Sequence, residues 1–325
     1  HYAWGTREAI PDILGATPDG QPVAEYWLGA HGKSPSTLGG VPLDQAIADD
    51  PSLIGAASEE QFGRLPFLMK ILSAAMPLSI QAHPSRSQAE EGFAREESIA
   101  LDPALRSYQD TWPKPEMLVA LTEFHGLNGF REPWQTMQLF RDLGAAADVE
   151  PVMGPLVHRH GEAALQEVLL DVLSLSEDRL TIIDAVLASA FQHRDDEGDL
   201  GEFARTALEL DEHFPRDPGI LAGLLLNRVT LQPGEATFVG AGVLHAHLSG
   251  TGIEVMASSD NVVRGGLTPK HIAVDELISI VQFAPDLPRV ESGHETAPGV
   301  FEYPSDCPEF DVWRLEVADG TPLAV

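Results

Sequence analysis

A run of short apolar segments with a period of two, between residues 227 and 257, constrains the fold of this 325-residue chain more than any other feature. The segments read RVTLQ, ATFV, VLHAHL and GIEVMA, and the turn sequences PGE and GAG separate the first three. Alternating apolar residues bury one face of a strand, and Gly and Pro between the segments favour tight turns. The pattern therefore predicts successive short antiparallel strands in a β-barrel or jelly roll.

The spacing of apolar residues changes along the chain and predicts its domains. Residues 1–128 contain short strand-like runs among many Gly and Pro residues, whereas residues 129–226 have the spacing of amphipathic helices. We therefore predict a mainly β fold in which residues 1–128 and 227–284 form one jelly-roll domain and residues 129–226 form an inserted all-helical domain. Residues 285–325 contain further strand-like runs, which are predicted to start another β domain that is incomplete.

Charge and composition narrow the classes of function. The chain carries 50 acidic and 20 basic side chains, a formal net charge of −30, which repels nucleic acids and anionic membranes. No apolar run approaches the roughly 20 residues of a membrane span, and no signal-peptide pattern opens the chain. The single cysteine, Cys307, cannot form an internal disulfide, which fits a reducing compartment. We expect a cytoplasmic protein that binds neither nucleic acid nor membrane, and we expect a monomer.

The placement of the lysines suggests an anion-binding site. Only four of the 20 basic residues are lysines, and three of these, Lys70, Lys114 and Lys270, lie in segments that also carry metal-ligand residue types. A compositional bias toward arginine explains the low number without any function. However, an ammonium is a compact point charge that suits an anionic oxygen, and arginine does not replace it freely. We therefore expect the remaining lysines to serve a site.

Two short motifs bring possible metal ligands together. Gln81 and His83 alternate in a strand-like run and so project from the same face, although the pair alone also fits a polar strand end before Pro84. Lys114 and Glu116 flank a proline, and the rigid backbone places both on one side of an extended stretch. By itself this second motif also fits a solvated ion pair on an edge strand.

A third motif adds imidazole. His245 and His247 alternate in the segment VLHAHL, and the pattern does not say which of them faces inward. A histidine inside a small barrel is also commonly a hydrogen-bonded core residue. Together the three motifs supply glutamine, histidine, glutamate and histidine, a set of nitrogen and oxygen donors that suits Zn²⁺ or a similar divalent transition ion.

The motifs belong to longer runs that resemble type I phosphomannose isomerase, the mannose-6-phosphate isomerase family. These runs are YAWG at 2–5, AEYWLGAH at 24–31, FLMKILSAAMPLSIQAHP at 67–84, KPEM at 114–117 and GAGVLHAHLSGTGIEVMASSDNVVRGGLTPKH at 240–271. The resemblance implies a cupin-type β jelly roll with a helical insertion and the start of a C-terminal cupin-like domain. It also implies interconversion of D-mannose 6-phosphate and D-fructose 6-phosphate through a cis-enediol.

The resemblance further implies roles for individual residues. One zinc ion per chain would be held by Gln81, His83, Glu116 and His245. Arg264 matches an essential arginine, which is better suited to stabilising negative charge than to accepting a proton, because its pKa is too high for an efficient base. Asp260 and Lys114 are the candidates for the base that moves the proton, and chemistry alone does not rank them. The positions expected to bind the sugar phosphate are Ser79, Lys70 and Lys270.

The sequence does not decide the role of one residue that departs from the family pattern, nor does it exclude one alternative function. His247 stands where the family often has tyrosine, so a second imidazole lies near the expected metal. The alternative to an isomerase is a metal-containing cupin that binds sugar phosphates without turning them over. A cupin oxygenase with two histidines and a carboxylate around iron fits less well, because Gln81 has no place in that ligand set.

Overall fold

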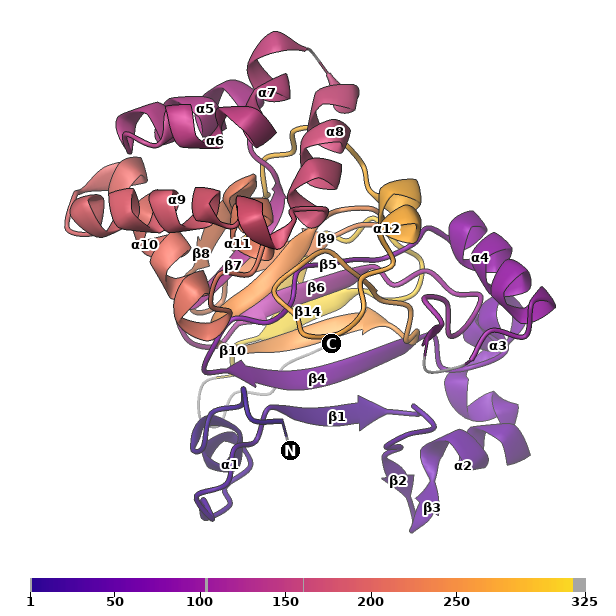
Figure 1. The fold of residues 1–325 in the computed structure, drawn as a ribbon. Coiled ribbons are helices and arrows are strands. Elements are labelled where there is room, and N and C mark those ends of the chain that lie inside the picture. The colour runs from indigo at the N-terminus through magenta and orange to yellow at the C-terminus, as the bar shows by residue number, and fades with distance from the viewer. Residues whose placement is uncertain (1, 103–104, 160, 318–325) are drawn as a thin grey trace.

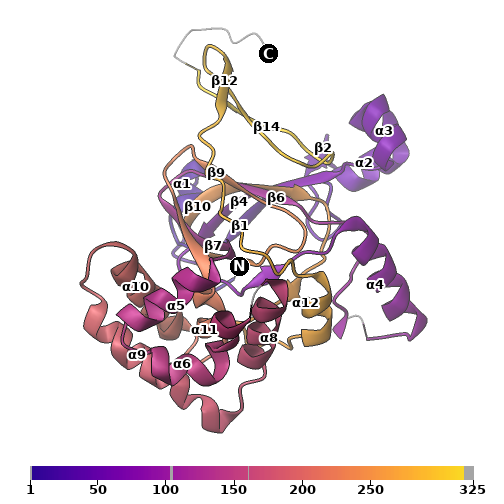
Figure 2. The ribbon, with the colours of Figure 1, turned by 90° about the horizontal axis from the view of Figure 1, so that it is seen from above.

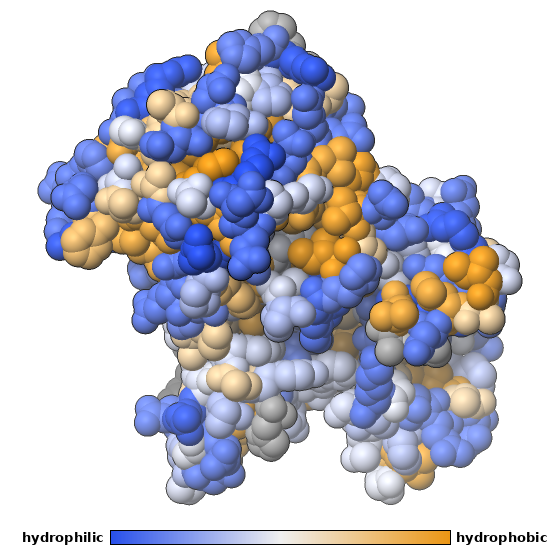
Figure 3. Space-filling view, in the orientation of Figure 1, coloured by the Kyte–Doolittle hydropathy of each residue, from blue (hydrophilic) through white to orange (hydrophobic). Residues whose placement is uncertain are grey.

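The structure of the chain is a computed structural model that describes residues 2–102, 105–159 and 161–317. Its centre is a set of antiparallel strands; the helices between Pro133 and Leu224 lie together on one side of it, and shorter helices lie around it (Figure 1). The face of the molecule in Figure 3 is mainly hydrophilic, in keeping with the net charge of −30, and smaller apolar patches interrupt it. In the described part of the chain, no helix combines the length and the apolar character that a membrane crossing requires.

Strand β10 (His245–Ala257) organises the centre of the fold because it takes part in two sheets. Its first half pairs with β5 (Gln81–Ala82) and β7 (Phe124–Phe130), and its second half pairs with β4 (Phe67–Ala74) and β6 (Glu116–Ala120). Each sheet is extended at its two edges. The flanking strands are β8 (Leu226–Leu231) and β11 (Val263–Arg264) in the first sheet, and β1 (Glu25–Gly29) and β9 (Ala236–Val239) in the second.

The single strand β10 corrects the predicted pair of strands. The sequence pattern predicts VLHAHL and GIEVMA as separate strands, whereas the structure joins them without a turn. Gly250 lies where the chain leaves the first sheet and enters the second. Its φ is 121°, and a Cβ at this position would lie 2.6 Å from the main-chain oxygen of Glu123. Glycine is required there because only a residue without a side chain fits this crossing.

The chain between β7 and β8 is helical and covers one face of the first sheet (Figure 2). Its apolar side chains form one continuous core with residues of that sheet, among them Ile80, Leu127 and Leu244. The helices are α5 (Pro133–Asp142), α6 (Ala146–Met153), α7 (Pro155–His158), α8 (Glu162–Leu173), α9 (Thr181–His193), α10 (Gly198–His213) and α11 (Gly219–Leu224), with the 3₁₀ turn η3 (Glu177–Arg179) between α8 and α9.

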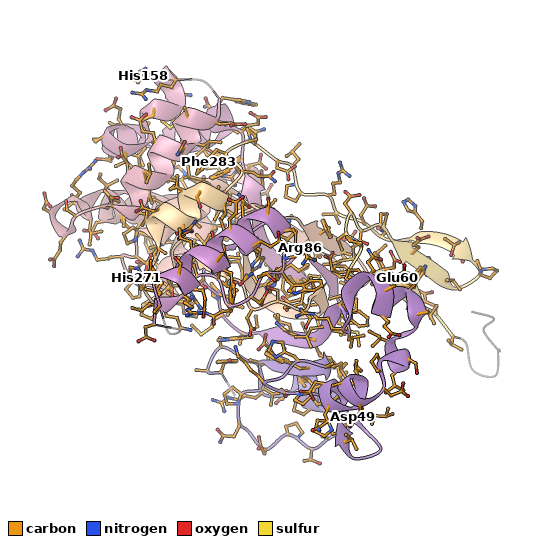
Figure 4. All side chains as sticks on the ribbon, turned by 90° about the vertical axis from the view of Figure 1, so that its right-hand side faces the viewer. Asp49, Glu60, Arg86, His158, His271 and Phe283 are labelled. Atoms are coloured by element: carbon orange, nitrogen blue, oxygen red, sulfur yellow. The ribbon has the colours of Figure 1, made fainter. Side chains whose placement is uncertain are left out.

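Smaller elements surround the two sheets. Asp49 and Glu60 mark two short helices at the periphery, α2 (Leu43–Asp49) and α3 (Ala56–Phe62) (Figure 4). Ser85 starts α4 (Arg86–Ser98) with a capping box, in which its hydroxyl and the Gln88 side chain satisfy opposite main-chain N–H groups. The remaining elements are α1 (Ala9–Ile13), β2 (Thr37–Leu38), β3 (Val41–Pro42), η1 (Pro51–Ile54) and α12 (Val274–Ile280).

The C-terminal segment forms a separate three-stranded sheet on the side of the two sheets opposite helices α5–α11 (Figure 2). Its strands are β12 (His294–Ala297), β13 (Val300–Tyr303) and β14 (Val312–Leu315). The Tyr303 hydroxyl donates to the main-chain oxygen of Gly234 at 2.5 Å and so joins this sheet to the turn before β9. Residues 318–325, which belong to the predicted incomplete domain, lie outside the described residues.

The prediction of a mainly β fold is correct only in part. Strands form the core that holds the site residues, but more of the described residues lie in helices than in strands. The reason is that the helical segment is long and that α4 and α12 are added around the sheets. The fold is therefore a two-sheet β structure with an extensive helical cover.

Candidate active site

A cavity of about 540 Å³ is lined by side chains of β4, β5, β6, β10 and β11 and by the loops between them. All of the predicted site residues except His83 line it. They are Lys70, Ser79, Gln81, Lys114, Glu116, His245, Asp260, Arg264 and Lys270. Two larger cavities, of about 790 and 850 Å³, contain none of the predicted site residues. The structure therefore brings together residues that are up to 200 positions apart in the sequence.

Two imidazoles and one carboxylate converge at the inner end of this cavity. The Nε2 atom of His83 lies 3.3 Å from Glu116 Oε2, and the Nε2 atom of His245 lies 3.0 Å from Glu116 Oε1. His83 is fully buried, and the other two are nearly so. One ligand atom from each of the three residues falls within a sphere that could hold a metal ion.

The tautomers of both histidines are set by main-chain oxygens. His83 Nδ1 lies 2.8 Å from the oxygen of Asn261, and His245 Nδ1 lies 3.0 Å from the oxygen of Val243. A carbonyl oxygen can only accept, so each Nδ1 carries the proton and donates it. Each ring therefore turns its Nε2 toward Glu116. This is the arrangement that metal-binding histidines have when a second group orients them.

Lys114 completes the cluster with a positive charge. Its Nζ donates to Glu116 Oε2 at 2.8 Å and to His83 Nε2 at 3.1 Å. Burial, followed by the charge of Lys114, lowers the pKa of His83 to about 4, so the imidazole is neutral near pH 7. Burial alone would raise the pKa of Glu116, but Lys114 and the two imidazoles hold it well below its usual value. Glu116 is therefore a carboxylate and His83 a neutral imidazole, the protonation states in which these side chains bind metals.

Gln81 and Arg264 reach the cavity through strand pairing. Gln81 is in register with His245 on one side and with Arg264 on the other. The Gln81 amide nitrogen donates to Ser79 Oγ at 3.5 Å, which leaves the amide oxygen available as a ligand. The Arg264 guanidinium is half-buried, and burial lowers its pKa. Within the described residues it forms no ion pair or hydrogen bond with another side chain, so its charge is free to meet an anion.

The loop that follows Arg264 is supported from the helical segment. The Asp217 carboxylate accepts from the main-chain nitrogens of Gly219 and Leu267, at 2.6 and 3.2 Å. A Cβ on Gly219 would lie 2.3 Å from the nitrogen of Leu267, so the start of α11 packs directly against this loop. Phe214, also from the helical segment, lines the cavity.

Comparison with known proteins agrees with the geometry of the site. Residues 1–133 match the sequence profile of phosphomannose isomerase type I, catalytic domain. Mannose-6-phosphate isomerase of Escherichia coli (strain K12) is 40% identical over 292 residues, which cover 87% of this chain and 73% of that protein. The human enzyme of the same name is 31% identical over 350 residues, which cover 97% of this chain and 80% of that protein. The chain belongs to the phosphomannose isomerase family.

Solved structures of phosphomannose isomerases have the same fold. A mutant of the Salmonella typhimurium phosphomannose isomerase superposes with a TM-score of 0.84 at 36% identity and covers 96% of this chain and 80% of that one. A zinc-bound mannose 6-phosphate isomerase superposes with a TM-score of 0.83 at 36% identity and the same coverage. The resemblance predicted from the motifs is thus confirmed at the level of the family.

In this phosphomannose isomerase family member, two carboxylates already balance the positive charge of Lys70. Its Nζ donates to Glu254 Oε2 at 2.9 Å and to Glu25 Oε1 at 3.3 Å, and both partners are largely buried. Burial would lower the pKa of Lys70, but these carboxylates raise it above its usual value. Lys70 therefore has less charge to offer a phosphate than the sequence suggests.

Asp260, a predicted base, is paired as well. Its carboxylate lies 3.3 Å from His31 Nε2 and 2.8 Å from Lys33 Nζ. The hydrogen bond from His31, and then that from Lys33, outweigh burial and hold the pKa of Asp260 below its usual value. A carboxylate stabilised in this way is a weak proton acceptor near pH 7.

Sequence reasoning missed several residues of the cavity. Glu25 and Glu254 were not predicted. His247, which the sequence placed near the expected metal, lines the cavity together with His245, with its Nε2 3.1 Å from Glu254 Oε1. The one available signal was Glu254 itself, a charged residue within the apolar run GIEVMA. A charged side chain in a buried strand requires a partner of opposite charge, and the partner of Glu254 is Lys70.

Proposed function

We propose that this chain interconverts D-mannose 6-phosphate and D-fructose 6-phosphate and that one zinc ion is held by Gln81, His83, Glu116 and His245. The observation that carries the proposal is the meeting of two imidazoles and a carboxylate beside a cavity that also contains the guanidinium of Arg264, which forms no ion pair within the described residues. Relatives in bacteria, plants and animals carry the name mannose-6-phosphate isomerase.

The donor set fits zinc. Two imidazole nitrogens, one carboxylate oxygen and one amide oxygen suit a borderline-soft divalent ion better than Ca²⁺ or Mg²⁺, which prefer oxygen ligands. Lys114 Nζ now lies 3.1 Å from His83 Nε2, and a metal would take the lone pair that accepts this bond. Zinc in this site would supply polarisation of substrate oxygens.

Proton transfer and the stabilisation of negative charge would be carried out by side chains of the protein. Moving a proton between C2 and C1 requires a base within reach and a positive group near the oxygen that gains charge. We propose Arg264 for the second role. For proton transfer we propose Lys114 and Asp260 as the two candidates: Lys114 lies inside the cluster but donates to Glu116, and Asp260 pairs with His31 and Lys33.

Binding of the sugar phosphate is proposed to involve Ser79, Lys70 and Lys270. Lys270 is exposed at the edge of the cavity, and within the described residues its ammonium forms no ion pair with a carboxylate. Lys70 contributes mainly by maintaining the charge balance of the cavity floor, since Glu25 and Glu254 already accept its hydrogen bonds. A local positive edge is necessary because the chain as a whole carries a charge of −30.

Replacing Lys270 with methionine should raise KM for mannose 6-phosphate about tenfold and leave kcat within about twofold. The phosphate is remote from the reacting carbons, so its contact with Lys270 contributes equally to ground and transition states. Steady-state kinetics on zinc-loaded protein measure both constants. A fall in kcat without a change in KM would place Lys270 at the reacting end of the substrate instead.

We also propose the domain organisation that the sequence predicts. A cupin-type jelly roll from residues 1–128 and 227–284 would form the catalytic domain, residues 129–226 the insertion, and residues 285–325 the start of a C-terminal cupin-like domain. The helices from Pro133 to Leu224 and the separate sheet after residue 293 support these boundaries. We further propose that the protein acts in the cytoplasm as a monomer, which its free thiol at Cys307 permits.

Exposed acidic residues of the insertion should not affect catalysis. The double substitution Asp195→Asn and Asp196→Asn should leave kcat and KM within about twofold of wild type, because the side chains line no part of the cavity and Asp195 is 85% exposed. Kinetics and a thermal melt on the same sample check this expectation. A large loss of turnover in a folded protein would show that this surface of the insertion contributes to the site.

The proposal is tested by metal analysis together with a coupled assay using mannose 6-phosphate and fructose 6-phosphate. We expect one zinc per chain and turnover of both sugars. Bound zinc and bound sugar phosphate without turnover would instead identify a non-catalytic cupin that binds sugar phosphates. Absence of zinc from a folded, active preparation would overturn the ligand assignment.

A further inference from the structure

Asn261 connects two segments that carry proposed zinc ligands. It lies between β10 and β11 and its exposed fraction is 0%. Its main-chain oxygen accepts the Nδ1 proton of His83 at 2.8 Å, the bond that leaves the Nε2 atom of the neutral ring without a proton. The position of this peptide therefore determines both the tautomer of His83 and the direction of its ring.

The side chain of Asn261 binds a different segment, residues 109–112. The amide oxygen accepts from the main-chain nitrogens of Gln109 and Asp110, at 2.7 and 3.2 Å. The amide nitrogen donates to the main-chain oxygens of Asp110 and Trp112, both at 2.8 Å. These four bonds use the donors and acceptors of the amide fully, and only an amide of this size can make them all.

Asp110 and Ser259 add further hydrogen bonds between residues 109–112 and the segment that contains Asn261. Asp110 Oδ2 accepts from the main-chain nitrogen of Asp260 at 2.9 Å, and Asp110 Oδ1 accepts from Ser259 Oγ at 2.9 Å. We call Asp110, Ser259 and Asn261 the clamp. Its three residues are buried or half-buried, so the hydrogen bonds among them compete little with water.

The clamp lies close to Glu116 along the chain. Trp112, whose main-chain oxygen the clamp holds, precedes the sequence Pro-Lys-Pro-Glu that ends at Glu116. The two prolines fix φ, so little of the restraint on Trp112 is lost before Glu116. One residue thus holds His83 through its backbone and the Lys114–Glu116 segment through its side chain.

We propose that Asn261 is a positioning residue for the metal: it holds His83 and Glu116 in the relative arrangement that binds zinc. The proposal rests on the zinc isomerase function proposed above and adds to it the element that assembles the ligands. Asn261 contacts neither the substrate cavity nor a proposed ligand atom, so its effect on catalysis is indirect.

The test is the substitution Asn261→Asp, which keeps the shape and replaces the donating nitrogen with a second acceptor. A carboxylate oxygen would then face the main-chain oxygens of Asp110 and Trp112 and displace the segment that leads to Glu116. Loss of an outer partner of a metal ligand typically costs 10- to 100-fold in affinity. We expect the dissociation constant of zinc, from chelator competition, to rise by about this factor, and the visible spectrum of the cobalt-substituted protein to change.

Asn227→Asp is the matched control. Asn227 is also buried, and its amide nitrogen donates to the main-chain oxygens of Asn128, Gly129 and Asp286. It does not line the active-site cavity. Its substitution should lower the melting temperature of the protein, as Asn261→Asp does, but should leave zinc affinity and the cobalt spectrum unchanged.

Ser259→Ala gives a milder variant in case Asn261→Asp does not fold. It removes only the hydroxyl that bridges Asp110 Oδ1 and the main-chain oxygen of Trp112, and it should raise the zinc dissociation constant about threefold. Folded Asn261→Asp with wild-type zinc affinity and an unaltered cobalt spectrum would overturn the inference, as would wild-type affinity in Ser259→Ala if only that variant folds. Failure of the wild-type chain to bind zinc would overturn the proposed function instead.

Discussion

Replacing His83 with alanine should empty the zinc site and reduce isomerase turnover to background. The imidazole is fully buried and neutral, its Nδ1 is held by the Asn261 oxygen, and its Nε2 points at Glu116. Alanine provides no donor atom for the metal. The loss of zinc affinity should exceed the 10- to 100-fold that is typical when a group hydrogen-bonded to a metal ligand is removed, because here a ligand itself is removed. Metal content after dialysis at a defined free zinc concentration, with the coupled assay, measures both effects.

His247→Phe provides the control for this experiment. His247 lies in the same cavity and on the same strand as His245, but its Nε2 is bound to Glu254 at 3.1 Å. The variant should retain zinc, because Glu116 and the two proposed imidazole ligands are unchanged. Stoichiometric zinc in His83→Ala would contradict the ligand assignment. An empty site in His247→Phe would show that the second imidazole ligand is His247.

Part of the β core could be predicted because short apolar runs are separated by Gly- and Pro-containing turns. The segment ATFV coincides with β9, and RVTLQ overlaps β8. The continuity of β10 could not be predicted, because the Ser-Gly-Thr-Gly sequence at 249–252 has the composition of a turn. In the structure Gly250 instead lets one strand pass from one sheet to the other, and this choice depends on Glu123 and Phe124 of a distant segment. Local sequence does not contain that information.

Most of the proposed metal ligands could be predicted because they lie in short local motifs. Gln81 and His83 are two residues apart, as are Lys114 and Glu116, so strand geometry alone places each pair on one side. The charge network around Lys70 was not visible, because its partners come from strand register: Lys70 is in register with Glu254 of β10 and with Trp27 of β1. Register between distant strands is fixed by the packing of the whole sheet, and a single sequence does not specify it.

The shared core of the helical segment and the first sheet was also beyond sequence reasoning. Helical spacing predicts where the helices lie, and the prediction of an insertion treats them as a separate unit. In the structure Asp217 binds the nitrogen of Leu267, in the loop after Arg264, and Leu267 has a positive φ of 54°. A buried leucine in this conformation is strained and needs support from its surroundings. The insertion thus helps to hold the loop that follows Arg264.

Replacing Arg264 with methionine should lower kcat about a hundredfold and change KM far less. The guanidinium is half-buried, and within the described residues no carboxylate pairs with it, so its charge is available to an oxygen that becomes negative during the reaction. A well-placed donor to developing charge contributes about 3 kcal/mol to the transition state, which corresponds to roughly a hundredfold in rate. Methionine keeps most of the volume and removes the charge. Steady-state kinetics on zinc-loaded protein give the two constants separately.

The zinc content of Arg264→Met should equal that of wild type, which separates this variant from His83→Ala. Comparison with Lys270→Met then distinguishes the two positive groups, since a phosphate contact raises KM and a contact to developing charge lowers kcat. If Arg264→Met keeps kcat within about threefold while KM rises steeply, Arg264 binds the phosphate. Stabilisation of the enediol would then fall to Lys114, the remaining buried cation beside Glu116, because Asp260 carries the wrong charge and Lys70 is held by two carboxylates.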